Sequence, residues 1–256
     1  MQLAYRKYGE GQTLLILHGL FGQSDNWNTL AKRFGETGFE VYTIDQRNHG
    51  LSPHSDVWNY DVMADDIKEF IDTHNLQNPI LLGHSMGGKT AMFFALKYNG
   101  ILDKLIVADM SPRAYEPHHD VVLDALNAVD FSKLNTRKEA EAVLSTYITD
   151  FGTKQFLLKN IYWEDTANAK MNWRFNLPVI TKNSNETLVA VPERTSNVNT
   201  LFLRGEKSNY INEATDIAEI EKHFPNYQLQ TITNAGHWLH AEQPEAFYHA
   251  VMAFIK

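Results

Sequence analysis

Residues 80–96 read ILLGHSMGGKTAMFFAL, and the character of the chain changes at a single serine. A short apolar run ends at Gly83, and small and apolar residues typical of a buried helix begin just after Ser85. The pattern G-x-S-x-G around Ser85 is typical of a reactive serine in a sharp, strained turn between a strand and a helix. Gly83 and Gly87 suit such a turn, because larger side chains there would collide with each other and with adjacent strands. The stretch therefore predicts a nucleophile, and the alternative is a serine that only caps the helix.

Several other short apolar runs occur along the chain, and helical patterns separate them. The predicted strands cover residues 13–19, 39–46, 79–85, 101–110, 198–205 and 227–237. The predicted helices cover residues 27–34, 60–76, 86–98, 214–224 and 244–255, with Asn59 as the N-cap of the second. Continuous apolar runs are typical of strands buried on both faces of a parallel sheet. The alternation of strands and helices predicts a doubly wound α/β fold.

Residues 112–197 interrupt this alternation. No stretch among them has a convincing strand pattern, whereas residues 121–129, 136–148 and 154–163 have helical patterns, and Thr136 with Glu139 forms a capping box. We therefore predict a helical insertion that covers the carboxyl edge of the sheet. The predicted domains are an α/β core of residues 1–111 and 198–256 and a lid of residues 112–197.

The composition excludes some classes of function. The 256 residues carry a formal net charge of -8 and show no basic stripe, which argues against a nucleic-acid partner. The absence of cysteine excludes disulfides, thiolate catalysis and cysteine-ligated zinc. Arg6 and Lys7 interrupt the N-terminal stretch, which lacks the apolar core of a signal peptide, and the apolar run near it is far shorter than a membrane span. We therefore expect a soluble, cytoplasmic protein without a membrane partner.

Polar side chains follow the predicted strands, and the carboxyl ends of parallel strands form the usual site of such a sheet. A serine hydroxyl needs a base, and His237 lies just past the last predicted strand. We predict His237 as the base; the alternative is a structural loop histidine. His84 is expected to point away from the pocket, and His18 and His49 are expected to shape loops and line its floor.

A developing oxyanion needs backbone N–H donors, which have no sequence signature of their own. Met86 directly follows Ser85, and one further donor is expected just after His18 and Gly19. We predict Leu20, rather than Phe21, as this second donor.

The chain resembles the α/β-hydrolases, and specifically the small bacterial YbfF-type esterases, over nearly its whole length. The resemblance rests on HGLFG at 18–22, RNHGLSP at 47–53, GHSMGGK at 83–89, QFLLK at 155–159, WRFNLPV at 173–179 and GHWLHAE at 236–242. It implies a mostly parallel eight-stranded sheet with a lid. It also implies hydrolysis of small-molecule carboxylic esters and thioesters, including acyl-CoA-type substrates, without a metal or an organic cofactor.

The acid that supports His237 departs from the commonest arrangement. Many α/β-hydrolases carry it three residues after a glycine, and here Ser208 lies three residues after Gly205. Asp109 ends the strand that follows the predicted elbow helix, and the resemblance implies Asp109 as the acid with Ser208 assisting as a second hydrogen-bond partner of His237. The alternative for Asp109 is a residue that only forms a turn, and Glu206 lies nearby but out of register.

Aromatic residues are the candidates for the substrate pocket. We name Phe21, Trp163 and Trp238, although most aromatic residues of the insertion are expected to pack in its own core. The predicted reaction is acyl transfer through a Ser85 acyl-enzyme. Carbon–carbon bond hydrolysis, cofactor-free haloperoxidase chemistry and a non-catalytic receptor on the same fold stay open as alternatives.

Overall fold

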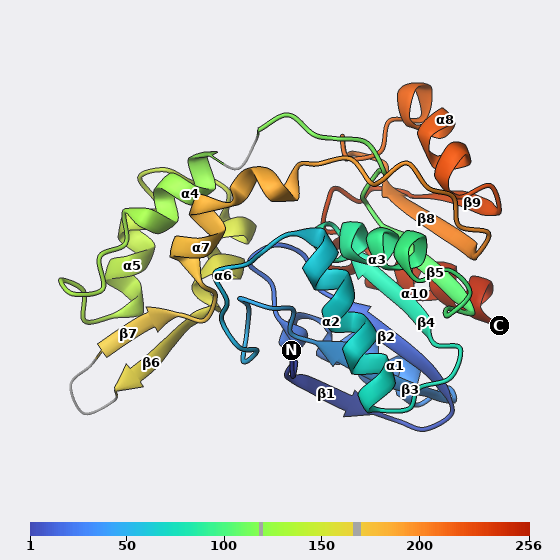
Figure 1. Cartoon of the computed structure of the whole chain (residues 1–256). Helices are drawn as coiled ribbons and strands as arrows, with labels where there is room; N and C mark the ends of the chain where they lie inside the picture. Colours follow the sequence, from blue (N-terminus) through green and yellow to red (C-terminus); the bar gives the residue numbers. More distant parts are fainter. Residues whose placement is uncertain (118–119, 166–169) are drawn as a thin grey trace.

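A seven-stranded sheet forms the centre of the computed structural model, which describes residues 1–117, 120–165 and 170–256 (Figure 1). The strands lie in the order β1-β3-β2-β4-β5-β8-β9; β1 is antiparallel to β3, and every other pair of neighbours is parallel. Their bounds are β1 Tyr5–Tyr8, β2 Gln12–Leu17, β3 Phe39–Ile44, β4 Ile80–His84, β5 Lys104–Ala108, β8 Asn199–Gly205 and β9 Tyr227–Ile232. The predicted α/β class is confirmed, but the sheet has seven strands where eight were expected. The sheet is one strand shorter than expected because, in the described chain, only the mostly exposed β1 precedes the first buried strand, β2.

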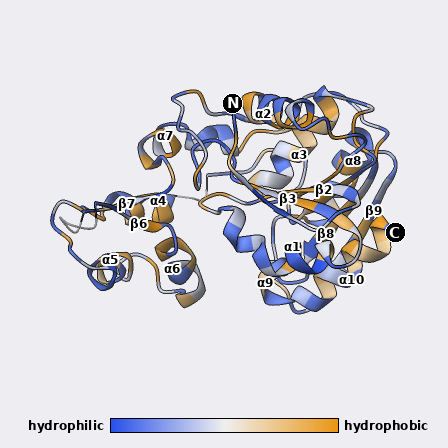
Figure 2. Cartoon of the chain, turned by 90° about the horizontal axis from the view of Figure 1, so that it is seen from below, coloured by the Kyte–Doolittle hydropathy of each residue, from blue (hydrophilic) through white to orange (hydrophobic). Residues whose placement is uncertain are grey.

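Helices cover both faces of this sheet (Figure 1). Their bounds are α1 Asn28–Gly35, α2 Tyr60–Thr73, α3 Met86–Lys97, α8 Glu213–His223, α9 Leu239–Glu242 and α10 Pro244–Ile255, with a 3-10 turn η1 at Ser24–Trp27. Leu14 and Ile16 of β2 pack in the cluster that contains α1 and α10, whereas Leu15 and Leu17 pack in the cluster that contains α2, α3 and α8. Burial on both faces explains why the strands are continuous apolar runs. Hydrophobic residues gather in the sheet and in α10 (Figure 2).

Most of the described chain between β5 and β8 lies beyond one end of the sheet, on the left of Figure 1. It contains α4 Asp120–Asn127, α5 Arg137–Leu144, α6 Phe151–Leu158, β6 Ile161–Asp165, β7 Lys170–Trp173, α7 Leu177–Lys182 and the 3-10 turn η2 Ser184–Thr187. The prediction that this stretch lacks strands is wrong, because β6 and β7 form an antiparallel hairpin. The expected helix of residues 154–163 ends early, since the β-favouring residues after Asn160 pair with β7 instead. The division into a core and a lid stays a prediction.

Three loops at one edge of the sheet carry the predicted nucleophile, acid and base. Ser85 directly follows β4, Asp109 directly follows β5, and His237 lies in the loop between β9 and α9. Parallel strands end at the same edge, so residues far apart in the sequence lie together there. Among the described residues, no helix combines the length and apolar character needed to cross a membrane.

Candidate active site

Ser85 occupies a strained turn between β4 and α3. Its backbone has φ 53° and ψ -118°, a region that residues other than glycine rarely adopt, and its side chain makes no capping bond to α3. A Cβ atom on Gly83 would lie 2.1 Å from the carbonyl oxygen of Gly87, and one on Gly87 would lie 2.5 Å from that of Leu17. Both glycines are therefore required by close backbone contacts, and the turn holds the serine hydroxyl out of the helix.

A chain of hydrogen bonds runs from Ser85 through His237 to Asp109. His237 Nε2 lies 2.9 Å from Ser85 Oγ, and His237 Nδ1 lies 2.7 Å from Asp109 Oδ2. The proton that Nδ1 donates to the carboxylate leaves Nε2 as the acceptor that faces the serine hydroxyl. The arrangement suits the removal of a proton from Ser85.

Asp109 is fully buried, and its carboxylate oxygens accept hydrogen bonds from neighbouring groups of the protein. Its Oδ1 accepts the Gly205 N–H at 3.0 Å, and its Oδ2 accepts the Ser208 hydroxyl as well as His237 Nδ1. Ser208 was expected to bind His237, but it contacts the acid instead. The Nδ1 proton of His237 is already donated to Asp109, so it is not available to Ser208. Glu206 lies apart from this chain and accepts the Asn234 N–H at 2.7 Å.

Tyr210 contacts the base and was not predicted from the sequence. Its ring stacks on the imidazole of His237, with centroids 3.7 Å apart and planes 15° from parallel. Burial raises the pKa of Tyr210 to about 12, so the stacked ring is neutral near neutral pH. No motif marks this residue, because the loop after β8 brings it to His237 only in the folded chain.

The loop after β2 presents one backbone donor beside Ser85. The Phe21 N–H is donated to His49 Nε2 at 3.2 Å, so it is not available to a substrate. Within the described residues, the N–H groups of Leu20 and Met86 have no acceptor, and both residues line a small cavity together with Ser85. This geometry favours Leu20 over Phe21 as an oxyanion donor.

Two buried histidines brace this loop. His18 Nδ1 donates to the Gly19 carbonyl and His18 Nε2 accepts the Gln46 N–H, while His49 Nδ1 donates to the Arg47 carbonyl. Burial lowers the pKa of His18 to about 4 and that of His49 to about 3, so both rings are neutral near neutral pH. Neutral rings can accept backbone N–H groups, which agrees with the loop-shaping role predicted for both.

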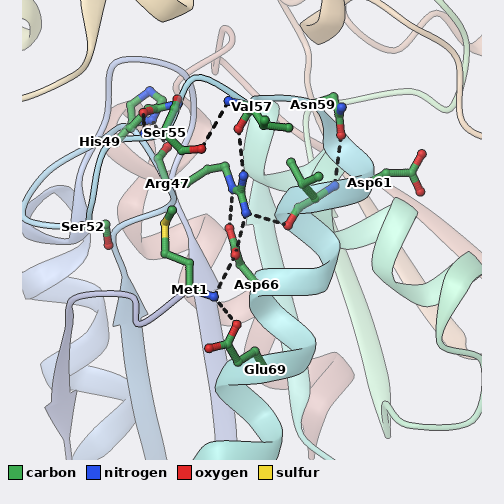
Figure 3. Close-up of polar contacts among 12 residues, drawn as sticks. Met1, Arg47, His49, Ser52, Ser55, Val57, Asn59, Asp61, Asp66 and Glu69 are labelled. Carbon is green, nitrogen blue, oxygen red and sulfur yellow. Dashed lines mark hydrogen bonds and ion pairs between the residues drawn. The ribbon is translucent and has the colours of Figure 1, made fainter.

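An ion pair anchors the loop that carries His49 (Figure 3). The Arg47 guanidinium contacts Asp66 of α2 at 2.5 and 2.7 Å and also donates to the Val57 and Val62 carbonyls. The N-terminal amine of Met1 lies 3.3 Å from the same carboxylate. Because both partners are largely buried, the pair fixes the loop against α2.

A cavity of about 250 Å³ opens over Ser85. The predicted pocket residues Phe21 and Trp238 line it, and so does His84, which was expected to point away. The ring of His84 reaches the cavity because its Nε2 donates to the His237 carbonyl at 2.7 Å. Trp163 is not among the lining residues; it lies on β6 with 40% of its surface exposed, and Phe156 of α6 lies at the cavity instead.

Comparisons with known proteins show what this chain is similar to. The family model described as the alpha/beta hydrolase fold matches residues 12–244. The sn-1-specific diacylglycerol lipase ABHD11 of Mus musculus is 37% identical over 250 residues, which cover 94% of this chain and 80% of that protein. Esterase YbfF of Escherichia coli (strain K12) is 33% identical over 243 residues, which cover 94% of this chain and 92% of YbfF. A solved structure described as a marine microorganism esterase has a TM-score of 0.95 and 43% identity and covers 99% of both chains.

Proposed function

This chain belongs to the α/β-hydrolase family and, within it, to the YbfF-type esterases, and we propose that it cleaves carboxylic esters through an acyl-enzyme on Ser85. It is an enzyme that acts on ester bonds. The observation that carries the proposed mechanism is the hydrogen-bond chain Ser85–His237–Asp109, with distances of 2.9 and 2.7 Å. A strained serine, an acceptor nitrogen and a buried carboxylate are the groups that acyl transfer requires.

In the first step, Ser85 Oγ attacks the acyl carbon while His237 Nε2 takes the hydroxyl proton. The Leu20 and Met86 N–H groups donate to the oxyanion of the tetrahedral intermediate, and the N-terminal end of α3 adds a favourable dipole. Asp109 stabilises the imidazolium that forms. His237 then gives its proton to the leaving oxygen, and the ester C–O bond breaks.

In the second step, water replaces the alcohol. His237 takes a proton from the water as its oxygen attacks the acyl carbon, and the same two N–H groups hold the second oxyanion. Collapse of this intermediate releases the carboxylic acid, and the proton on His237 returns to Ser85. The stacked Tyr210 ring keeps the imidazole in one plane through both steps.

The lining of the cavity supports an apolar acyl group. Phe21, Phe156, Leu157 and Val122 surround the space over Ser85, and the last three come from residues 112–197. We propose that this insertion acts as a lid that excludes water from the acyl group. An acylglycerol, the substrate class in the name of the mouse relative, fits the proposal, and a thioester would follow the same route with a thiolate as the leaving group.

Turnover of 4-nitrophenyl butyrate tests the mechanism. The wild-type protein should release nitrophenolate and react with a fluorophosphonate probe, and Ser85→Ala should do neither. His237→Ala should lose turnover and most of the labelling, because its serine lacks a base. Equal turnover by Ser85→Ala and the wild type would contradict the proposed mechanism.

A further inference from the structure

A second cavity, of about 590 Å³, adjoins the one over Ser85. The residues that line both cavities are Asn26, Thr153, Phe156, Trp238 and His240. The rings of Phe156 and Trp238 meet edge to face with centroids 4.2 Å apart, so one residue of α6 and one of the His237 loop form the boundary. We call the second space the outer cavity and the space over Ser85 the inner cavity.

The two cavities differ in chemistry. Apolar side chains such as Leu20, Val122 and Leu157 line the inner cavity and not the outer one. The residues that line only the outer cavity are mostly polar: Asp25, Thr29, Asp150, Gly152, Gln155, Lys159, Ala241 and Glu242. Three of them carry a carboxylate and one carries an ammonium group, so negative charge dominates the outer lining.

The carboxylates of the outer cavity are held in place by the backbone. Asp150 Oδ2 accepts the Thr153 N–H at 2.6 Å, and this bond lowers the pKa of the carboxyl group. Glu242 accepts the N–H groups of Gly236 and Trp238 at 2.7 and 3.2 Å. Asp25 lies in an ion pair with Arg6, which reduces its effect on a ligand. The oxygens of Asp150 and Glu242 therefore form a fixed set of charged acceptors.

An ester whose carbonyl carbon lies at Ser85 has one portion on each side of that carbon. The hydrophobic effect favours the acyl chain in the apolar inner cavity, which leaves the outer cavity to the alcohol portion. Resting on the proposed esterase function, we infer that the outer cavity binds the alcohol portion of the substrate and selects an alcohol that donates hydrogen bonds and carries no negative charge. Hydroxyl groups can donate to the carboxylate and amide oxygens of the lining, whereas an anionic alcohol is repelled by them.

Three butyrates that differ only in the alcohol test this inference: propyl butyrate, glycerol monobutyrate and butyryl glycerol phosphate. Titration of released butyric acid at constant pH gives kcat/KM for each. We expect the highest value for the glycerol ester, a lower value for the propyl ester and the lowest value for the phosphorylated ester. All three form the same butyryl-enzyme, so the deacylation rate should not depend on the alcohol, and the discrimination should lie in kcat/KM.

Two charge variants of the lining sharpen the test. Asp150→Asn keeps an N-cap side chain on α6 and removes one negative charge. The ratio of kcat/KM for the phosphorylated ester to kcat/KM for the glycerol ester should therefore rise about two- to fivefold. Lys159→Gln should change the same ratio in the opposite direction. Both effects should shrink at high salt, because salt screens exposed charges. Asp130→Asn is the matched control, since Asp130 lies on the insertion, is paired with Lys133 and lines neither cavity.

Several results would overturn the inference. Equal kcat/KM values for the three butyrates would overturn it. Equal changes in Asp150→Asn and Asp130→Asn of the kcat/KM ratio between the phosphorylated ester and the glycerol ester would also overturn it. Absence of turnover for all three, as in Ser85→Ala, would overturn the proposed esterase mechanism together with the inference. Turnover of all three esters with the same kcat/KM would overturn the inference about the outer cavity and leave the proposed esterase mechanism intact.

Discussion

At the scale of single residues, Asp109 decides how His237 is held. The carboxylate is fully buried, and its φ of 51° places it in a conformation that residues other than glycine rarely adopt. We predict that Asp109→Asn lowers kcat for 4-nitrophenyl butyrate about 10³- to 10⁴-fold, because an amide does not hold the imidazole in the required tautomer. Steady-state kinetics at saturating substrate measure this change, and KM should change little.

Two further variants serve as controls for Asp109. Glu206→Gln should keep nearly wild-type kcat, since the Glu206 carboxylate accepts the Asn234 N–H and lies apart from the hydrogen-bond chain of Ser85, His237 and Asp109. Ser208→Ala removes one hydrogen bond to a charged group and should lower kcat about tenfold. An active Asp109→Asn beside an inactive Glu206→Gln would show that the acid is Glu206.

At the scale of elements, Lys89 joins α3 to the segment that leaves the sheet after Asp109. Its side chain is fully buried, and its ammonium group donates to the carbonyls of Ser111, Pro112 and Arg113 at 2.8, 3.2 and 2.7 Å. Burial lowers the pKa of Lys89 to about 7, whereas three acceptors stabilise the protonated amine. The lysine therefore ties the elbow helix to the start of the insertion.

We predict that Lys89→Met lowers the free energy of unfolding by about 1–3 kcal/mol, because buried carbonyl groups lose their donor. Urea denaturation measures this change. Lys104→Met is the matched control: Lys104 also donates to carbonyls, those of Phe254 and Ile255, but its side chain is only partly buried. An equally small effect of both substitutions would contradict the role assigned to Lys89.

At the scale of the whole molecule, four buried histidines make stability depend on pH. Burial lowers the pKa of His18 to about 4, of His49 and His240 to about 3, and of His84 well below its ordinary value. Below pH 6.5 the unfolded chain binds protons at these sites while the folded chain does not. Stability should therefore fall as the pH decreases from 6.5 towards 4, by about 1.4 kcal/mol per pH unit for each histidine.

Urea denaturation at pH 7 and at pH 5 checks this dependence. His240→Gln should reduce the difference between the free energies of unfolding at the two pH values, because it removes one of the four buried histidines. His249→Gln is the control and should leave the difference unchanged, since His249 is exposed on α10. A difference that His240→Gln does not alter would contradict the assignment of His240 as a neutral buried group.

Local signals predicted most of the regular structure. The Asn59 side chain caps α2 by accepting the Val62 N–H, and Thr136 with Glu139 forms the predicted capping box of α5. These signals act within one turn of a helix, so they can be read without the fold. The exposed strand β1 and the hairpin of β6 and β7 were not predicted, because pairing with a partner strand stabilises them.

The sequence by itself determined the α/β class and the sharp turn at Ser85, since apolar runs, caps and close-packed glycines are local properties of the chain. Only the tertiary structure decided which side chains meet at the edge of the sheet. It brought Ser208 to Asp109, stacked Tyr210 on His237, turned His84 towards the cavity and left Trp163 outside it. Such contacts join residues from different loops, and their geometry depends on how the strands pair and the helices pack, which no local pattern contains.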